Sequence, residues 1–228
     1  MIFSTKPTRT EILPGAVYLI FELFILPTLL SLVNVALDLK LSFARINFLY
    51  FLINFAVVLP MFRRYLLRSV KDAWKMRFAT IRYALLGFLG YQVLSELLAG
   101  LIFRVCPLFV NFNDASILYA LDQDFVLMAM GSILLVPVTE ETLFRGMIFR
   151  GLYDRSPLAA YLVSMAAFAA IHVMGYIGSA EPVMILLAFL QYLPAGYCLC
   201  FAYRHSGSIL SPILMHMIVN AVAVISTR

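Results

Sequence analysis

Two adjacent glutamates, Glu140 and Glu141, lie inside an apolar stretch of the chain, and Arg145 follows one helical turn after the second. A carboxylate in hydrocarbon costs roughly 3 kcal/mol or more, so a pair there indicates a functional site. On a helix Glu141 and Arg145 share a face and can pair, whereas Glu140 points about 100° away from its neighbour. We therefore expect Glu141 to be neutralised and Glu140 to face the bundle interior as a general base. The alternative, a structural cluster in which both acids hold Arg145, stays open on this motif alone.

The next apolar segment carries Phe168 and His172 one helical turn apart. A polar turn at residues 154–157 separates this segment from the glutamates, and Glu140 and His172 each lie 16 residues from Ser156. In an antiparallel helical hairpin both would stand about 24 Å from the bend, at matching depth. We therefore expect His172 to lie beside Glu140. A lone histidine in a membrane helix can also be a simple interhelical hydrogen-bond partner.

The last apolar segment carries His216 and Asn220, again one turn apart. An amide donates two hydrogen bonds and an imidazole one or two, which suits the stabilisation of a developing oxyanion. Both side chains could instead serve helix packing. Three polar faces on three separate helices favour a shared site.

The composition predicts an all-α, polytopic membrane bundle. Hydrophobic residues make up 63% of the 228 and charged residues 13%, which leaves too little polar surface for a soluble globule. Apolar runs long enough to span a bilayer predict about seven transmembrane helices, near Leu13–Leu37, Ile46–Phe62, Tyr83–Phe103, Phe125–Phe149, Leu158–Ile177, Pro182–Tyr203 and Ile209–Ile225.

Lysine and arginine are divided unequally between alternate loops. One side receives thirteen (Lys6, Arg9, the seven from Arg63 to Arg82, Arg145, Arg150, Arg155 and Arg204) and the other four (Lys40, Arg45, Arg104 and Arg228). The positive-inside rule then predicts a cytoplasmic N-terminus and an outside C-terminus, and we expect the plasma membrane of a prokaryote.

The net charge of +5 is concentrated in the segment 63–82 and does not indicate nucleic-acid binding. Basic residues alternate there with apolar ones, which predicts an amphipathic cytoplasmic segment held by anionic membrane lipids. Docking of an acidic substrate is the alternative. The oligomeric state cannot be read from the sequence.

We expect one integral membrane domain, 1–228, with no repeat. We expect residues 125–225 to form its functional core and residues 1–124 to form the transmembrane helices that surround this core. The other internal acids, Glu22 and Glu96, are expected to be structural carboxylates, since a proton-relay role would need an aqueous path. Cys106, Cys198 and Cys200 show no framework spacing and are expected to be apolar filler.

Taken together, these residues resemble the CPBP (CAAX-processing and bacteriocin-processing, or Abi) intramembrane proteases, which include the type II CAAX prenyl endopeptidases. The family pattern is E-E-x-x-x-R, F-x-x-x-H and H-x-x-x-N or -D on separate helices. This chain matches it over about 125–225, with Glu140, Glu141, Arg145, Phe168, His172, His216 and Asn220. The resemblance implies that Glu140 and His172 activate a water and that His216 and Asn220 bind the oxyanion, with Glu141, Arg145 and Phe168 supporting.

The catalytic type has two interpretations. Glu140, His172 and His216 could together ligate zinc. The H-E-x-x-H helix of zinc proteases is absent, however, and these ligands would have to converge from three helices. We therefore expect a glutamic-type protease that requires no cofactor, with zinc as the alternative.

The substrates implied by the resemblance are membrane-associated proteins or peptides, either prenylated C-terminal tails or peptide precursors. We expect the active site to lie below the cytoplasmic face, reached by water through a polar cavity. A catalytically inactive immunity or scaffold protein of the same fold would not need the polar residues Glu140, His172, His216 and Asn220. A transporter would show broken helices in two related halves, and no such repeat is present.

Overall fold

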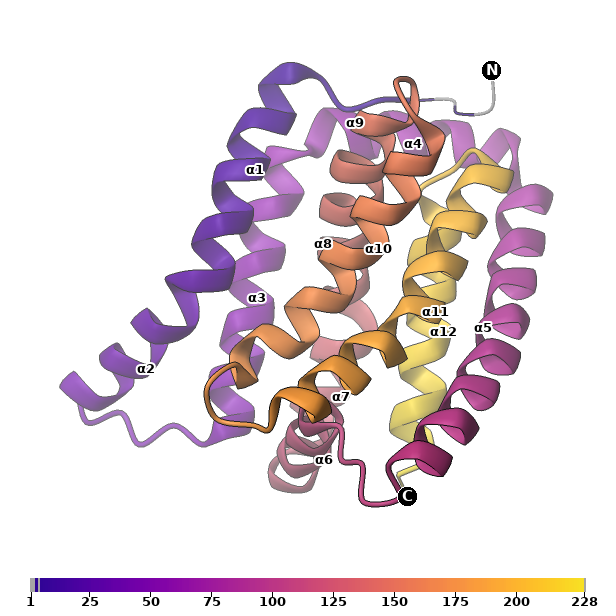
Figure 1. Ribbon diagram of the computed structural model, residues 1–228. Coiled ribbons are helices and arrows are strands. Elements are labelled where there is room, and N and C mark those ends of the chain that lie inside the picture. The colour runs from indigo at the N-terminus through magenta and orange to yellow at the C-terminus, as the bar shows by residue number, and fades with distance from the viewer. Residues whose placement is uncertain (1–2, 4, 228) are drawn as a thin grey trace.

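The computed structural model describes residue 3 and residues 5–227, and every regular element in this part of the chain is helical. Figure 1 shows the long helices side by side, with α4 and α9 at one end and α6 at the other. The first half comprises α1 (Arg9–Phe24), α2 (Leu26–Ala36), α3 (Phe43–Met61), α4 (Arg63–Lys75), α5 (Arg77–Val105) and α6 (Phe112–Gln123). The second half comprises α7 (Phe125–Met130), a π segment (Gly131–Leu135), α8 (Val136–Glu141), a second π segment (Thr142–Phe149), α9 (Arg150–Tyr153), α10 (Pro157–Val173), a 3-10 turn (Met174–Tyr176), α11 (Pro182–Ser206) and α12 (Leu210–Ile225).

The predicted helical membrane bundle is confirmed, and each expected apolar run is helical. Five helical stretches in the described residues are long and apolar enough to cross a membrane: Phe43–Met61, Arg77–Val105, Phe125–Tyr153, Pro157–Tyr176 and Pro182–Ser206. The pair α1 and α2 passes the same test together, with a bend of 49°. Pro27 explains this bend, because its ring removes an N–H and clashes with the preceding turn. The seventh run, α12, has only 16 residues, fewer than the roughly 20 that a straight span needs.

The polar turn between the glutamate helix and α10 lies where the sequence predicts it. Ser156 caps α10 by accepting a hydrogen bond from the Ala159 N–H at 3.2 Å. Asp154 accepts bonds from Lys6 at 2.8 Å and from Arg150 at 2.7 Å. These two cations hold the pKa of the Asp154 carboxyl below its usual value.

A cluster of large aromatic side chains fills the bundle at the end where α4 and α9 lie. We call it the aromatic plug: Phe3, Phe62, Tyr65, Phe149 and Tyr203, each no more than 7% exposed. Inside it the Tyr65 and Tyr203 hydroxyls share a hydrogen bond of 2.9 Å. The plug therefore closes that end of the bundle.

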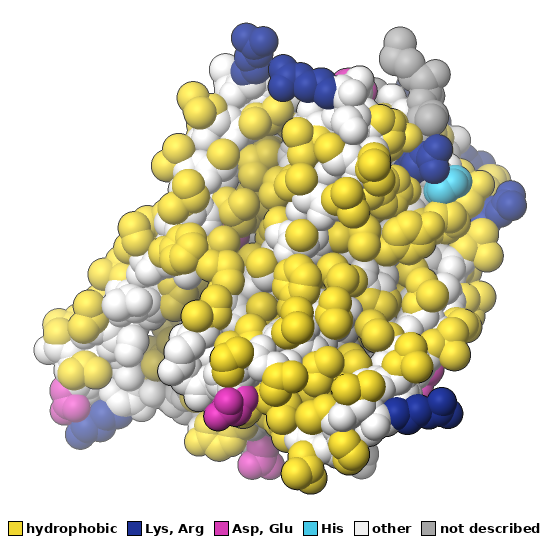
Figure 2. Space-filling model, in the orientation of Figure 1, with side chains coloured by type: hydrophobic (Ala, Val, Ile, Leu, Met, Phe, Trp, Pro, Cys, Tyr) yellow, Lys and Arg dark blue, Asp and Glu magenta, His cyan; other side chains and the backbone are white. Residues whose placement is uncertain are grey.

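Basic side chains gather at the same end, which we call the basic end, and acidic ones at the α6 end (Figure 2). The segment 63–82, expected as a basic loop, is helical: it forms α4 and the start of α5. Arg145 was counted among the loop cations of this side, and that assignment is wrong, because its side chain is fully buried among the helices. Arg228, counted on the opposite side, lies outside the described residues.

Candidate active site

A cavity of about 570 Å³ lies inside the second half of the bundle. All four side chains expected to do chemistry line it: Glu140 from α8, His172 from α10, and His216 and Asn220 from α12. Three helices that are separate in the sequence thus deliver their polar faces to one space. Glu141 and Arg145 do not line this cavity and lie behind its wall.

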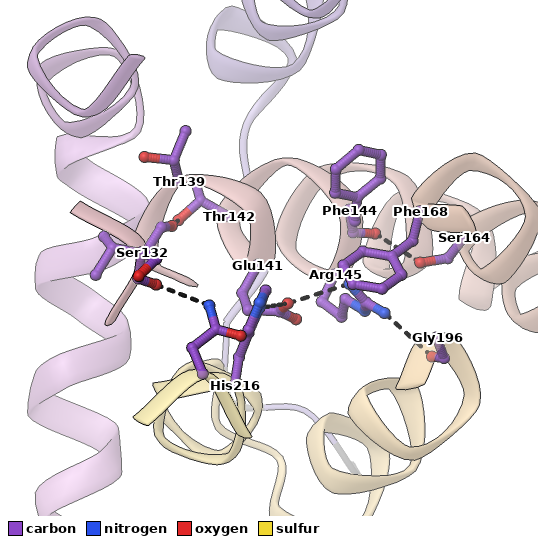
Figure 3. Close-up of polar contacts among 12 residues, drawn as sticks. Ser132, Thr139, Glu141, Thr142, Phe144, Arg145, Ser164, Phe168, Gly196 and His216 are labelled. Atoms are coloured by element: carbon purple, nitrogen blue, oxygen red, sulfur yellow. Dashed lines mark hydrogen bonds and ion pairs between the residues drawn. The ribbon is translucent and has the colours of Figure 1, made fainter. Parts of the chain in front are cut away.

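Glu141 is the centre of the buried polar network. Its Oε1 accepts a hydrogen bond from Arg145 Nη1 at 3.1 Å and another from His216 Nδ1 at 2.8 Å. Figure 3 shows the Arg145 and His216 side chains reaching this carboxylate. Glu141 and Arg145 are both fully buried, so the expected pairing is present and is shielded from water. The bond to His216 links α8 to α12, a contact that the sequence did not predict.

Arg145 is held by two further contacts. Its Nη2 donates to the Gly196 carbonyl of α11 at 3.1 Å, and its guanidinium lies over the Phe168 ring at 4.4 Å from the centroid. A guanidinium over an aromatic face is a stabilising cation–π arrangement. Gly196 allows α10 and α11 to approach closely, because a Cβ there would lie 3.1 Å from the Met165 backbone. Phe168 thus supports Arg145 and also lines the cavity.

His172 is oriented by its own helix and by a neighbouring aromatic ring. Its Nδ1 lies 2.8 Å from the Phe168 carbonyl, which requires Nδ1 to carry the proton and leaves Nε2 as the acceptor in the neutral ring. The imidazole stacks on Tyr192 with centroids 4.2 Å apart. Tyr192 is fixed in turn by donating to Asp114 at 2.6 Å. No direct hydrogen bond joins His172 to Glu140 among the described residues, although both line the cavity.

A π segment prepares the partner of Asn220. The Val136 N–H bonds to the Gly131 carbonyl, five residues back, and the following residue, Pro137, has no N–H to donate. The Ser132 carbonyl is therefore free of a π-helical partner, and Asn220 Nδ2 donates to it at 2.7 Å. The second N–H of this amide remains for another acceptor. Single-turn π segments are frequent at functional sites.

Other acidic side chains also reach the cavity. Glu22 of α1 is buried and lines it, and its Oε2 has no protein hydrogen-bond partner, as is also true of Glu140 Oε2. The sequence favoured a structural role for Glu22, and the cavity provides the path that a functional role would need. The sequence did not lead us to predict Tyr192 or Asp114 as residues of the site. The polar pair of Gln191 and Tyr192 within an apolar span was the only sequence feature that pointed to Tyr192. Glu96 is exposed and does not line the cavity.

The described residues do not supply a metal site. Among them no three His, Cys, Asp or Glu side chains are grouped closely enough to hold an ion, although Glu140, His172 and His216 line the same cavity. The bonds of His172 Nδ1 to the Phe168 carbonyl and of His216 Nδ1 to Glu141 leave only Nε2 of each ring free.

The fold and the site define a helical membrane protein with carboxylate and histidine side chains around an internal cavity. Residues 122–222 match the family described as Type II CAAX prenyl endopeptidase Rce1-like. This match covers every motif residue from Glu140 to Asn220 and confirms the resemblance drawn from the sequence. Over these residues the chain is similar to the CAAX-type intramembrane endopeptidases. The comparisons with curated proteins and with solved structures gave no match.

Proposed function

We propose that this chain hydrolyses a peptide bond of a membrane-associated substrate with a water activated by Glu140 and His172. The observation that supports the proposal is the convergence of Glu140, His172, His216 and Asn220 on one cavity. Two of these side chains already carry an orientation that the reaction needs. His172 presents Nε2 as an acceptor, and Asn220 retains one N–H.

In the proposed reaction a water lies between Glu140 and His172. Glu140 takes a proton from this water, while His172 Nε2 accepts the hydrogen bond of the second proton. The resulting hydroxide attacks the scissile carbonyl. Glu140 then passes its proton to the departing amine, so that one carboxylate serves as base and then as acid.

The developing oxyanion would be stabilised by His216 and Asn220. Because His216 Nδ1 donates to Glu141, its Nε2 can donate only when the ring is doubly protonated. One oxygen of Glu141 accepts from both His216 and Arg145, which fixes the orientation of the His216 ring. Glu141 thus acts through His216, and it is a positioning residue rather than a second base.

Replacing Asn220 with alanine is expected to lower kcat by about 10²–10³-fold with KM nearly unchanged, because one oxyanion donor is lost. The measurement is steady-state cleavage of a reporter peptide in proteoliposomes. Asn47→Ala is the matched control, since Asn47 also lines the cavity but donates only to the Phe43 carbonyl of its own helix. Equal losses in the two variants, or a rise in KM alone, would contradict the assignment of Asn220.

Exhaustive chelation is expected to leave the activity of the purified protein unchanged, because the proposed water is activated without a metal. The measurement is the cleavage rate before and after dialysis against a chelator, with metal analysis of the same sample. A zinc enzyme would instead be inhibited reversibly and restored by zinc. In that case His172→Ala and His216→Ala would also lose a bound ion together.

A further inference from the structure

The cavity has a mouth, and the mouth lies at the α6 end. The lining side chains that are exposed are Asp114 and Leu118 of α6 together with Ala223, Ser226 and Thr227 of the C-terminal segment. Lining side chains nearer the basic end, among them Leu199 and Met215, are buried. In Figure 1 α6 and the C-terminus lie at the same end of the bundle.

The opposite route is blocked. The aromatic plug and the buried side chains of Leu143 and Met147 occupy the bundle between the cavity and the basic end. No residue of α4 or α9 lines the cavity. A peptide could pass from the basic end to Glu140 only by displacing this cluster, whereas the α6 end offers an open, polar entrance.

The charges of the two ends indicate which side each end faces. By their places in the helices, most of the chain's 17 lysines and arginines lie at the basic end: Lys6, Arg9, Arg63, Arg64, Arg68, Lys71, Lys75, Arg77, Arg82, Arg150, Arg155 and Arg204. The α6 end carries Lys40, Arg45 and Arg104 among the described residues, against the acids Asp38, Asp114, Asp122, Asp124 and Glu181. The positive-inside rule places the basic end in the cytoplasm and the α6 end outside.

We propose that the substrate enters from the non-cytoplasmic side, so that the peptide bond cleaved belongs to a translocated segment of a membrane protein or secreted precursor. The inference rests on the proposed hydrolysis at Glu140 and names its substrate class. It departs from our expectation of a site below the cytoplasmic face and disfavours a cytoplasmic prenylated tail. The mouth suits a neutral or basic peptide, because exposed Asp114 lies on its rim.

Cysteine accessibility tests this orientation without requiring activity. Single cysteines would be introduced by Val219→Cys inside the cavity, Ser226→Cys at the mouth and Lys71→Cys on α4, in a background with Cys106, Cys198 and Cys200 replaced by alanine. Each variant is treated with a charged, membrane-impermeant maleimide in right-side-out and in inverted vesicles. Val219 and Ser226 both lie on the proposed route into the cavity, so the test does not depend on the folding of one variant.

We expect Val219→Cys and Ser226→Cys to be labelled at least tenfold faster in right-side-out vesicles, and Lys71→Cys only in inverted ones. The reversed pattern would overturn the proposal. Labelling of Ser226→Cys from outside with Val219→Cys protected would also overturn it, since the mouth would then not lead to the site. The labelling is repeated in a Glu140→Gln background, where the same pattern would show that access to the cavity does not depend on catalysis. If Glu140→Gln still cleaved substrate, the proposed mechanism would fail while the labelling result stood.

Discussion

Substitution of Glu140 by glutamine is expected to lower peptide hydrolysis by at least about 10²-fold while the protein folds normally. Glutamine keeps the shape of the side chain but cannot take a proton from water at neutral pH. Glu140 Oε2 has no protein hydrogen-bond partner, so the exchange breaks no contact made by that oxygen. The rate of reporter cleavage and the thermal denaturation midpoint, measured on the same preparation, check both parts of the prediction.

Two other carboxylates provide matched controls for this variant. Glu96→Gln changes an exposed acid away from the cavity and should retain full activity. Glu141→Gln should lower both stability and rate, because it weakens the bonds that Arg145 and His216 make to one oxygen. Full activity in Glu140→Gln would be incompatible with a glutamate-activated water.

Removal of the Arg145 side chain charge, as in Arg145→Met, is expected to reduce the free energy of unfolding by about 3–5 kcal/mol. The substitution leaves the fully buried Glu141 without its permanent cationic partner. It also removes the bond to the Gly196 carbonyl and the guanidinium over Phe168. Reversible denaturation in a mixed detergent, followed by circular dichroism, measures the change.

A double-mutant cycle separates the charge from the packing. Arg145→Met combined with Glu141→Gln should lose less stability than the sum of the single variants, because no uncompensated charge remains buried. Arg145→Lys keeps the charge without the planar fork and should fall between the wild type and Arg145→Met. Strict additivity, or a loss below about 1 kcal/mol in Arg145→Met, would show that the pair contributes little.

The parts of the site that local helix geometry determines could be predicted from the sequence. Residues four apart share a helical face, so the pairing of Glu141 with Arg145 followed from spacing alone. The placement of Phe168 and His172 on one face followed in the same way, and their rings lie 4.7 Å apart. Hydropathy likewise predicted the apolar helices, because the bilayer sets a minimum length for an apolar run.

The remaining features depend on how helices far apart in the sequence pack. His216 lies 75 residues from Glu141, so no spacing rule could predict their hydrogen bond. The contact of Asn220 with Ser132 depends on a π segment, which shifts the backbone register in a way that hydropathy does not report. Arg145 was counted as a loop cation because its sequence neighbours do not reveal that it is fully buried.

The position of the cavity mouth could not be predicted for a related reason. It depends on which end of the bundle is filled by side chains. The residues of the aromatic plug come from the N-terminal segment, the junction between α3 and α4, α4 itself, α11 and the π segment before α9, which meet only in the folded chain. The helix α6, which borders the mouth, is too short and too polar to have been noticed as an apolar run.

The most direct test of the central claim, peptide hydrolysis at Glu140, is a mass-spectrometric comparison of peptide termini in three membrane preparations. They would come from cells of the source organism that produce the wild type, Glu140→Gln at a matched level, or no copy of the chain. We predict a set of new termini, located in translocated segments, that appears only with the wild type. Identical termini with the wild type and Glu140→Gln would contradict the account.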